Sequence, residues 1–479
     1  MARVLSVTSL GVLLTLANTS VIDVALPAIR AEFGASALGV DAVLLSYMIV
    51  NVVLLLAFGR ISDIYGRKRV FILGLAGFAA ASLACALAPT VWALAAFRGV
   101  LGVAAAAVLA NTTALILDSL PPDRVSVALG YNVLTASLAQ VAGPLVGGAL
   151  VSLGGWRVVF IVNIPLALGA AALGFFALPG RNPGPAESFD GWSALYSLIA
   201  LTGMIGGITA SGFQANGQGL LFGGLAVCFV FGVLFVRRQA RIAHPLLDLA
   251  LLGDAERNLA YVTGFIVSGV RFSVVLVVSL LCQTHFGLSP LEAAKRVVVI
   301  ASGLAVSAPL SGHIMRKTGL SAHLPTIGLG LVVLGLGGLR LQLSHGDAGS
   351  SVIVPLFVLG VGIGLFATPN TASILRGVPA SQRGVANGLR TMSQNCGSTV
   401  FVALSLALIG VALPAQDKVA LYITGAAAKA LNADAFLMRG FGYAVDFLML
   451  AALGGLAFSG LRLIVRKATS RASESVPNP

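Results

Sequence analysis

The sequence predicts an all-helical membrane protein, and three observations support this fold class. Of its 479 residues, 57% are hydrophobic and only 10% are charged. The mean hydropathy of +0.97 leaves too little polar surface to cover a soluble globule. Apolar runs of about 20 residues, long enough to cross a bilayer as helices, follow one another along the chain and are separated by short polar turns.

These runs predict fourteen transmembrane helices. An even number of spans returns both termini to the same side of the membrane. The expected helices cover residues 5–29, 42–60, 70–88, 91–117, 126–152, 158–178, 192–212, 219–236, 258–283, 291–314, 322–343, 351–375, 383–412 and 441–465.

The distribution of basic residues predicts which side this is. When alternate loops are assigned to opposite faces, about nineteen of the 30 Lys and Arg residues fall on the face that carries both termini, which is therefore expected to be cytoplasmic. The net charge of +13 is spread over short loops without a basic domain interleaved with aromatics. This pattern excludes nucleic acid as an expected partner and favours contact with membrane lipid.

Charge is concentrated in one short stretch, GRISDIYGRKRV at residues 59–70. Gly59 and Gly66 are expected to bracket a loop between the second and third helices. Gly312 and Gly319 bracket GHIMRKTG in the second half at the same spacing. A shared loop pattern indicates an internal repeat, an organisation common in secondary transporters.

Two other glycine-rich stretches, GLGLVVLGLGG at 328–338 and GVGIG at 360–364, do not predict a nucleotide site. Neither follows a strand or ends in Gly-Lys-Ser/Thr. Small residues at helical spacing instead favour close packing of helices in lipid.

The stretch at 59–70 resembles the signature loop of the major facilitator superfamily, Gly-x-x-x-Asp-x-x-Gly-Arg-Lys/Arg. Gly59, Asp63, Gly66, Arg67 and Lys68 match this pattern. Asp63 is placed where it could meet the positive N-terminal end of a helix from the other half. Arg67 could pair with Asp118 at the end of the fourth helix, and such contacts would latch the cytoplasmic side shut.

Further motifs resemble the fourteen-helix drug:proton antiporter subfamily. AGPLVGGAL, with Gly143, Pro144, Gly147 and Gly148, is similar to the antiporter motif of drug exporters. The same subfamily is resembled by four further stretches, at 155–165, 244–252, 286–293 and 378–397. The resemblance implies two six-helix bundles with two additional helices, 192–212 and 219–236, between them.

The expected domain organisation follows from this resemblance. It consists of an N-terminal six-helix bundle at 1–180, two inserted helices at 181–240, a cytoplasmic linker at 241–257, a C-terminal six-helix bundle at 258–466 and a cytoplasmic tail at 467–479.

Ionisable residues inside the membrane are candidates for function because they are costly there. Asp23 is expected about 9 Å, and Arg98 about 10 Å, from the outer ends of their helices, so the two share a level. We expect an Asp23–Arg98 pair in which the carboxyl group loads and releases a proton. A static ion pair that holds two helices together is the alternative. The resemblance also associates Arg98 with proton transfer, although Leu101 replaces a glutamine common in that motif.

The first helix departs from the subfamily pattern. Asn18 stands where the subfamily usually has an acid, and Asp23 stands where it usually has an asparagine. Five residues correspond to about 140° net around a helix, so Asp23 cannot simply replace the lost acid. Proton coupling is therefore expected to be either rewired or absent.

Arg271 bears on the substrate because it is expected near the midplane, where transporters of this type bind their cargo. An unpaired arginine there would favour an anionic or zwitterionic compound. Pairing with Asp23 or snorkelling along a groove is the alternative. Arg390 is assigned to gating or packing and Asp446 lies near an outer end. The intramembrane amides, which could bind substrate or link helices, are Asn18, Gln140, Gln283, Asn370, Asn387 and Gln394.

The sequence thus predicts a proton-coupled exporter of drug-like amphiphiles in the plasma (inner) membrane, with a small-molecule substrate and protons as partners. The alternative is a specialised exporter or facilitator of one anionic or zwitterionic metabolite or antibiotic. We expect a monomer and no cofactor. Scattered histidines and cysteines argue against an enzyme or a metal site, and the lack of a phosphate-binding loop argues against ATP-driven pumping.

Overall fold

A computed structural model describes residues 2–35, 37–179, 190–213, 217–242, 245, 247, 249–286, 288, 290–317, 319–345, 352–379, 382–411 and 434–474. These residues form α-helices and two short 3-10 helices, Leu249–Leu252 (η1) and Gly319–Ala322 (η2), and no strand is found among them. The first α-helices are α1 (Ala2–Phe33), α2 (Ala37–Tyr65), α3 (Arg67–Ala86), α4 (Val91–Ser119), α5 (Pro122–Gly154), α6 (Trp156–Ala177), α7 (Gly191–Phe213) and α8 (Gly217–Gln239).

The remaining α-helices are α9 (Ala255–Thr284), α10 (Pro290–Lys317), α11 (Leu324–His345), α12 (Ile353–Ile374), α13 (Arg383–Val411) and α15 (Asp434–Glu474). Each predicted segment overlaps one of the observed helices, which confirms the all-helical membrane fold. Eleven helices of the described chain are long and apolar enough to cross a membrane. The count of fourteen crossings stays a prediction.

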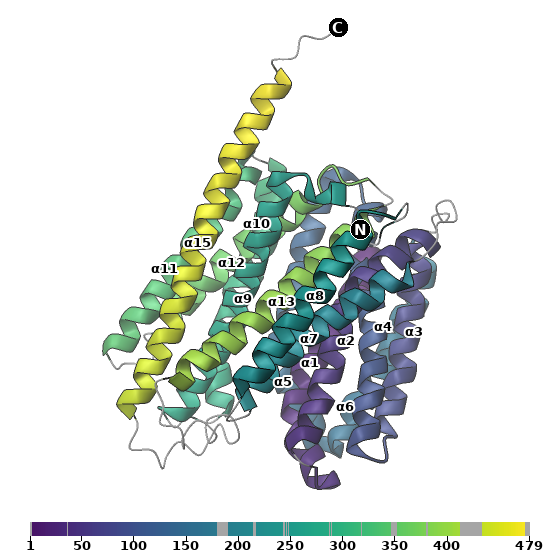
Figure 1. The fold of residues 1–479 in the computed structure, drawn as a ribbon, viewed down its shortest axis with the longest axis vertical. Coiled ribbons are helices and arrows are strands. Elements are labelled where there is room, and N and C mark those ends of the chain that lie inside the picture. The colour runs from purple at the N-terminus through teal and green to yellow at the C-terminus, as the bar shows by residue number, and fades with distance from the viewer. Residues whose placement is uncertain are drawn as a thin grey trace. The chain divides into compact units, whose positions relative to one another are not determined.

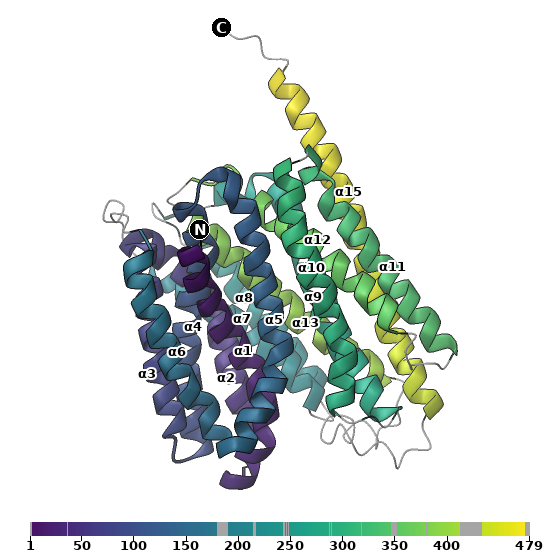
Figure 2. The same cartoon turned by 180° about the vertical axis from the view of Figure 1, so that it is seen from behind.

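The chain divides into two compact units, both drawn in Figures 1 and 2. Unit 1 comprises Met1–Gly203, Val227–Leu251 and Leu375–Met392. Unit 2 comprises Met204–Ala226, Leu252–Ile374 and Ser393–Pro479. The first turns of α13 thus belong to unit 1, although they come late in the sequence.

Unit 1 is built around α4, which packs against α2, α3 and α1, while α1 also packs along α5 and α6. Its core includes the fully buried rings of Tyr47, Phe71, Phe78, Phe160 and Trp156. Large apolar side chains on the outer faces of the helices remain exposed, as expected for surfaces that face lipid rather than water.

In unit 2, glycines on the facing sides of α10, α11 and α12 let these helices pack with their backbones in close contact. A Cβ atom added at Gly303 would lie 2.5 Å from the carbonyl oxygen of Phe357, and one at Gly328 would lie 2.6 Å from that of Gly362. Gly360 packs in the same way against Ile300. These contacts confirm that glycines of 328–338 and 360–364 pack helices.

Candidate functional site

The α2–α3 corner carries the residues of the signature motif, and its shape corrects one expectation. The stretch from Gly59 to Gly66 is not a loop, because α2 continues to Tyr65 and α3 begins at Arg67. Apolar residues such as Ile64, which is buried, continue the helical pattern past residue 60. Gly66 alone makes the turn with φ 97°, a conformation that a residue with a Cβ atom rarely adopts. Gly312, the counterpart of Gly59 in the second half, likewise lies within a helix, α10, and not at the start of a loop.

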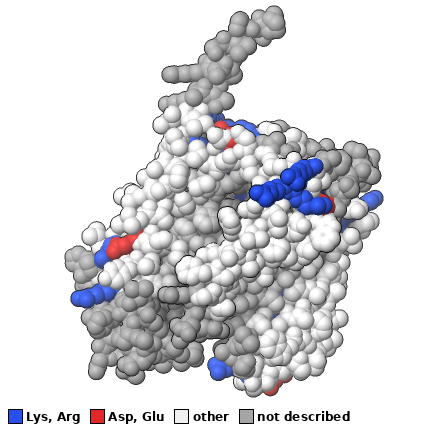
Figure 3. Space-filling view, viewed as in Figure 1, with Lys and Arg blue, Asp and Glu red and all other residues white. Residues whose placement is uncertain are grey.

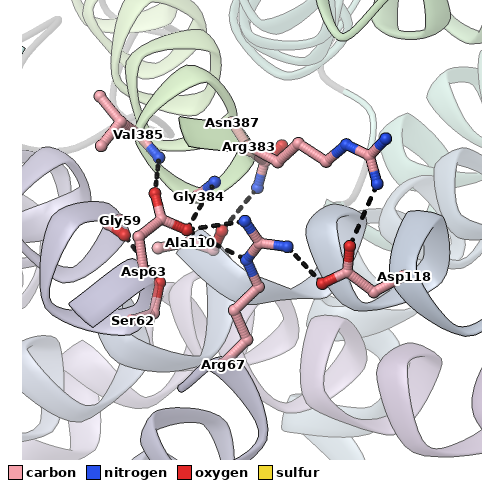
Figure 4. A network of polar contacts seen from close by, with 10 residues as sticks. All are labelled: Gly59, Ser62, Asp63, Arg67, Ala110, Asp118, Arg383, Gly384, Val385 and Asn387. Carbon is pink, nitrogen blue, oxygen red and sulfur yellow. Dashed lines mark hydrogen bonds and ion pairs between the residues drawn. The ribbon is translucent and has the colours of Figure 1, made fainter. Parts of the chain in front are cut away.

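Asp63, on the last turn of α2, lies against the N-terminus of α13 (Figure 4). Its Oδ1 atom accepts a hydrogen bond from the backbone N–H of Gly384 and its Oδ2 atom accepts one from Val385, both at 3.2 Å. The first N–H groups of a helix lack partners within the helix and carry partial positive charge. The expected contact between Asp63 and a helix N-terminus from the second half of the sequence is therefore present.

Arg67 joins Asp63 to Asp118 at the end of α4. Its Nη2 atom lies 2.7 Å from Asp63 Oδ1, and its Nη1 atom donates to Asp118. Asp118 also accepts a hydrogen bond from Arg383, the first residue of α13, at 3.2 Å. Two carboxylates thus meet two guanidinium groups, which balances their charges. This pairing matters because the side chain of Asp63 is only 2% exposed.

Glycines let α13 approach α2 closely at this point. A Cβ atom added at Gly59 would lie 2.6 Å from the carbonyl oxygen of Gly384. One added at Gly384 would lie 2.6 Å from Asp63 Oδ1, and one at Gly388 would lie 2.6 Å from the carbonyl oxygen of Leu55. Only glycine fits these positions without displacing a neighbouring helix.

A second polar layer lies one turn farther along α13. Asn387 is fully buried and donates from Nδ2 to the carbonyl oxygens of Ala110 at 2.8 Å and Leu109 at 3.4 Å. Arg390 donates from Nε and Nη2 to Asn387 Oδ1, at 3.1 and 3.0 Å. These bonds fix the orientation of the amide and hold its NH2 group toward α4. We refer to Asp63, Arg67, Asp118, Arg383, Asn387 and Arg390 as the α13 latch.

Lys68, the last residue of the motif, attaches the corner to α6. Its Nζ atom donates to the carbonyl oxygen of Leu178 at 2.7 Å and lies 5.5 Å from the centre of the Phe175 ring. A cation at a helix C-terminus is favoured by the helix dipole. Lys68 therefore caps α6 rather than pairing with an acid.

Arg98 of α4 is fully buried and connects three helices. Its Nε atom donates to the carbonyl oxygen of Val43 in α2 at 2.6 Å, and its Nη1 atom donates to Oδ1 of Asn18 in α1 at 3.1 Å. The guanidinium also lies 4.9 Å from the centre of the Tyr47 ring. Asn18, one of the amides expected either to bind substrate or to link helices, accepts a hydrogen bond from Arg98 and so links α1 to α4.

The expected Asp23–Arg98 pair lies outside the part of the chain that can be described, because the side chain of Asp23 is not described. That expectation measured the depth of Asp23 from a helix end at residue 29, whereas α1 continues to Phe33. The pairing itself stays a prediction.

Two of the other amides expected to bind substrate or to link helices make hydrogen bonds within the protein. Asn370 donates to the carbonyl oxygen of Ala260 at 3.0 Å and accepts from Arg462 at 3.1 Å, so its amide links α9, α12 and α15. Gln283 donates to Oγ of Ser279 at 3.0 Å within its own helix. Arg271 is half-buried in α9, with its guanidinium 5.4 Å from the centre of the Phe272 ring.

Gln394 is half-buried and lies close to Gly264 of α9. A Cβ atom added at Gly264 would lie 3.6 Å from Nε2 of Gln394. The side chains of Gln140 and Pro144 lie outside the described residues. In the antiporter motif, Gly143 is buried and Gly148 is half-buried. A Cβ atom added at Gly147 would lie 3.0 Å from the carbonyl oxygen of Val21 in α1, so this glycine lets α5 pack closely against α1.

Several partners in these networks were missed from sequence. Arg340 of α11 donates to Asp446 of α15 at 2.7 Å, which makes Asp446 part of an ion pair that is more than one-third exposed. Arg383 and its neighbours Gly384 and Val385 were not expected in the latch. The sequence did carry one signal for this contact, because Gly384 and Gly388 lie four residues apart at the start of α13 and leave room for a neighbouring helix. No cluster of three or more potential metal ligands is found among the described residues.

Comparisons with known proteins agree with the motifs. A sequence model described as Major Facilitator Superfamily matches residues 8–402. The multidrug resistance protein Stp of Mycobacterium tuberculosis is 29% identical over 401 residues, which cover 83% of this chain and 74% of that protein. The probable actinorhodin transporter of Streptomyces coelicolor is 32% identical over 418 residues, which cover 83% of this chain and 71% of that protein.

The fold is also similar to that of solved transporters. The crystal structure of the human organic anion transporter MFSD10 superposes with a TM-score of 0.64 at 17% identity and covers 96% of this chain and 99% of that one. The motif at the α2–α3 corner, the family match over most of the chain and the shared fold lead to one conclusion. This chain is a multi-pass membrane protein that belongs to the major facilitator superfamily.

Proposed function

We propose that this protein is a proton-coupled secondary transporter that exports drug-like amphiphilic compounds by alternating access. It would lie in the plasma (inner) membrane with both termini in the cytoplasm. Its family membership and the names of its relatives, which include a multidrug resistance protein and an antibiotic transporter, support this proposal. Its partners would be the cargo, protons and membrane lipid, and it would act without a cofactor.

The observation that carries the proposal is the α13 latch. It joins the ends of α2 and α4, from the first half of the sequence, to the start of α13, from the second half. Its bonds are short polar contacts around glycines rather than interlocked large side chains, so they can break and reform without repacking a core. Opening the latch would let cargo enter from the cytoplasm, and closing it would seal that side.

Coupling to protons would require a carboxyl group whose protonation changes during the cycle. We assign this role to Asp23, with Arg98 as the cation that lowers its proton affinity when the two approach. Arg271 is proposed to meet the cargo in unit 2. The bonds made by Asn370 and Gln283 argue for structural roles of these two amides. Gln394 is proposed as a second substrate residue in that unit.

The test uses purified protein reconstituted in vesicles with an imposed pH gradient and no nucleotide. A cationic dye should move against its own gradient with the wild type and not with Asp23→Asn. The Asp23→Asn variant should still exchange dye down a dye gradient, since only coupling is removed. Dye movement that ignores the pH gradient in the wild type would contradict proton coupling.

A second candidate function is favoured by the bond between Asn18 and Arg98. At this position an uncharged amide, rather than an acid, accepts the hydrogen bond from the buried arginine. An amide partner for this buried cation suits an anionic or zwitterionic cargo and altered or absent proton coupling. Binding of anionic amphiphiles without proton release, lost in Arg271→Ala, would support this second function against the first.

A further inference from the structure

Helix α8 carries two exposed arginines at its C-terminal end. Arg237 lies in the last turn, and the backbone bonds from the N–H of Ala240 to Val236 O and from the N–H of Arg241 to Arg238 O continue the helical turn through Arg241. Arg237 and Arg241 are four residues apart, so they lie about 5–6 Å from each other on one side of the helix. Neither side chain has an ion-pair partner among the described residues.

The opposite side of α8 is the one that packs. The Phe231 ring lies 6.1 Å from that of Tyr196 in α7. Farther along, Arg238 binds Asp190 with Nε and Nη2, at 3.0 Å each, and the buried Gln239 donates to Ser193 at 2.6 Å. These contacts fix the rotation of the helix. They direct Arg237 and Arg241 away from α7.

The side of α8 that faces away from α7 is apolar in the turns that precede the two arginines. Val230 lies about 20° and Leu234 about 60° around the helix from Arg237, and their side chains are 51% and 39% exposed. Phe229, about 80° around, is 74% exposed. Only 6% of the membrane-spanning window of this helix is buried within the described chain, so the described residues leave most of the helix surface uncovered.

We infer that this side of α8 is a binding site for an anionic phospholipid. We name it the α8 lipid site and define it by Arg237, Arg241, Phe229, Val230 and Leu234. The lipid phosphate would be held by the two guanidinium groups, whose N–H donors match phosphate oxygens, and one acyl chain would lie along the three apolar side chains. Figure 3 shows one group of Lys and Arg side chains with an Asp or Glu beside it, on a face that is otherwise mostly uncharged.

The neighbouring charges support an anionic rather than a zwitterionic headgroup. Among the residues that the structure describes, Asp190 is the acid at this end of the helix; it is only 8% exposed and is engaged by Arg238 and Ser193. Three arginines against one acid leave an excess of two positive charges. The partial negative charge of the helix C-terminus holds the arginines in place without cancelling this excess.

The test measures retained lipid by native mass spectrometry of the full-length protein, delipidated and then titrated with phosphatidylglycerol or with phosphatidylcholine of the same acyl chains. Arg237→Gln/Arg241→Gln is compared with Arg3→Gln/Arg316→Gln, which removes two exposed arginines from separate helices. The first variant should bind phosphatidylglycerol about tenfold more weakly than the wild type, and the control should match the wild type. Binding of phosphatidylcholine should be weak and equal in all three.

Two results would overturn the inference. Equal affinity of both double variants for phosphatidylglycerol would show that the arginines act only through overall charge. Displacement of the lipid by soluble glycerol 3-phosphate, at concentrations comparable to the lipid, would show an anion site that needs no acyl chain. Thermal unfolding of each variant without lipid serves as the check on folding, and a lipid-induced rise in unfolding temperature gives an independent readout.

Discussion

The guanidinium group of Arg98 donates to the amide oxygen of Asn18 across 3.1 Å in the buried interior of unit 1. A buried cation needs its hydrogen bonds satisfied, and the partners of Arg98 include this amide and the carbonyl oxygen of Val43. This relationship gives Asn18 the helix-linking role that was one of the two expected for the intramembrane amides.

Asn18→Leu should therefore destabilise the protein. Removing the acceptor leaves part of a buried guanidinium without its bond, which costs about 1–3 kcal/mol in the free energy of unfolding. Asn18→Asp is the matched variant, because it keeps an acceptor oxygen and adds charge attraction. Thermal unfolding in detergent should show a lower midpoint for the leucine variant only. Equal midpoints for both variants would contradict the role of this bond.

Neutralising Asp63 should open the α13 latch. Asp63→Asn removes the negative charge at the α13 N-terminus and one bridge to Arg67, a loss of about 1–2 kcal/mol that raises the open population about 5- to 30-fold. The readout is the labelling rate of Thr113→Cys, a position buried in α4 beside Arg390, with the four native cysteines replaced. Asp446→Asn, which breaks an ion pair between α11 and α15, is the control and should leave this rate unchanged.

A single methyl group in the glycine contact should have a similar effect. In Gly384→Ala the new Cβ atom would lie 2.6 Å from both Asp63 Oδ1 and the carbonyl oxygen of Gly59, so α13 must move away from α2. Gly460→Ala in α15 meets nothing within 4 Å and is the matched control. We expect faster labelling of Thr113→Cys in the first variant alone. An unchanged rate would mean that the contact can absorb the methyl group.

The sequence predicted the local half of the latch and missed the distant half. Asp63 and Arg67 are four residues apart, so their pairing follows from helix geometry, and Asp118 ends a predicted helix nearby. Arg383 and Asn387 lie more than 260 residues further along the chain, and periodicity does not indicate which helices meet. Asn370 shows the same limit, because a buried amide looks alike in sequence whether it binds cargo or holds Arg462.

Acid should loosen the attachment of α7 to α8 through Asp190. Burial raises the pKa of this carboxyl group, but hydrogen bonds from Arg238 and Ser193 outweigh burial and hold the pKa below its usual value. A carboxyl whose pKa is lower in the folded state stabilises the fold above its unfolded pKa, and this stabilisation is lost as the pH falls through the folded pKa. The unfolding midpoints of wild type and Asp190→Asn should therefore differ at pH 7 and converge below about pH 4. A difference that stays constant over this range would contradict the assignment.

The glycine faces of unit 2 give the last prediction, which concerns stability rather than gating. A Cβ atom at Gly360 of α12 would overlap the carbonyl oxygen of Ile300 in α10, and both atoms belong to rigid helix backbones. Gly360→Ala should therefore separate these helices and destabilise the protein by about 1–3 kcal/mol, the usual cost of overpacking. Gly330→Ala in α11 meets nothing within 4 Å and should leave the unfolding midpoint unchanged or raise it, because alanine favours helix more than glycine does. If both substitutions shifted the midpoint equally, helix propensity rather than close packing would explain the glycines of this unit.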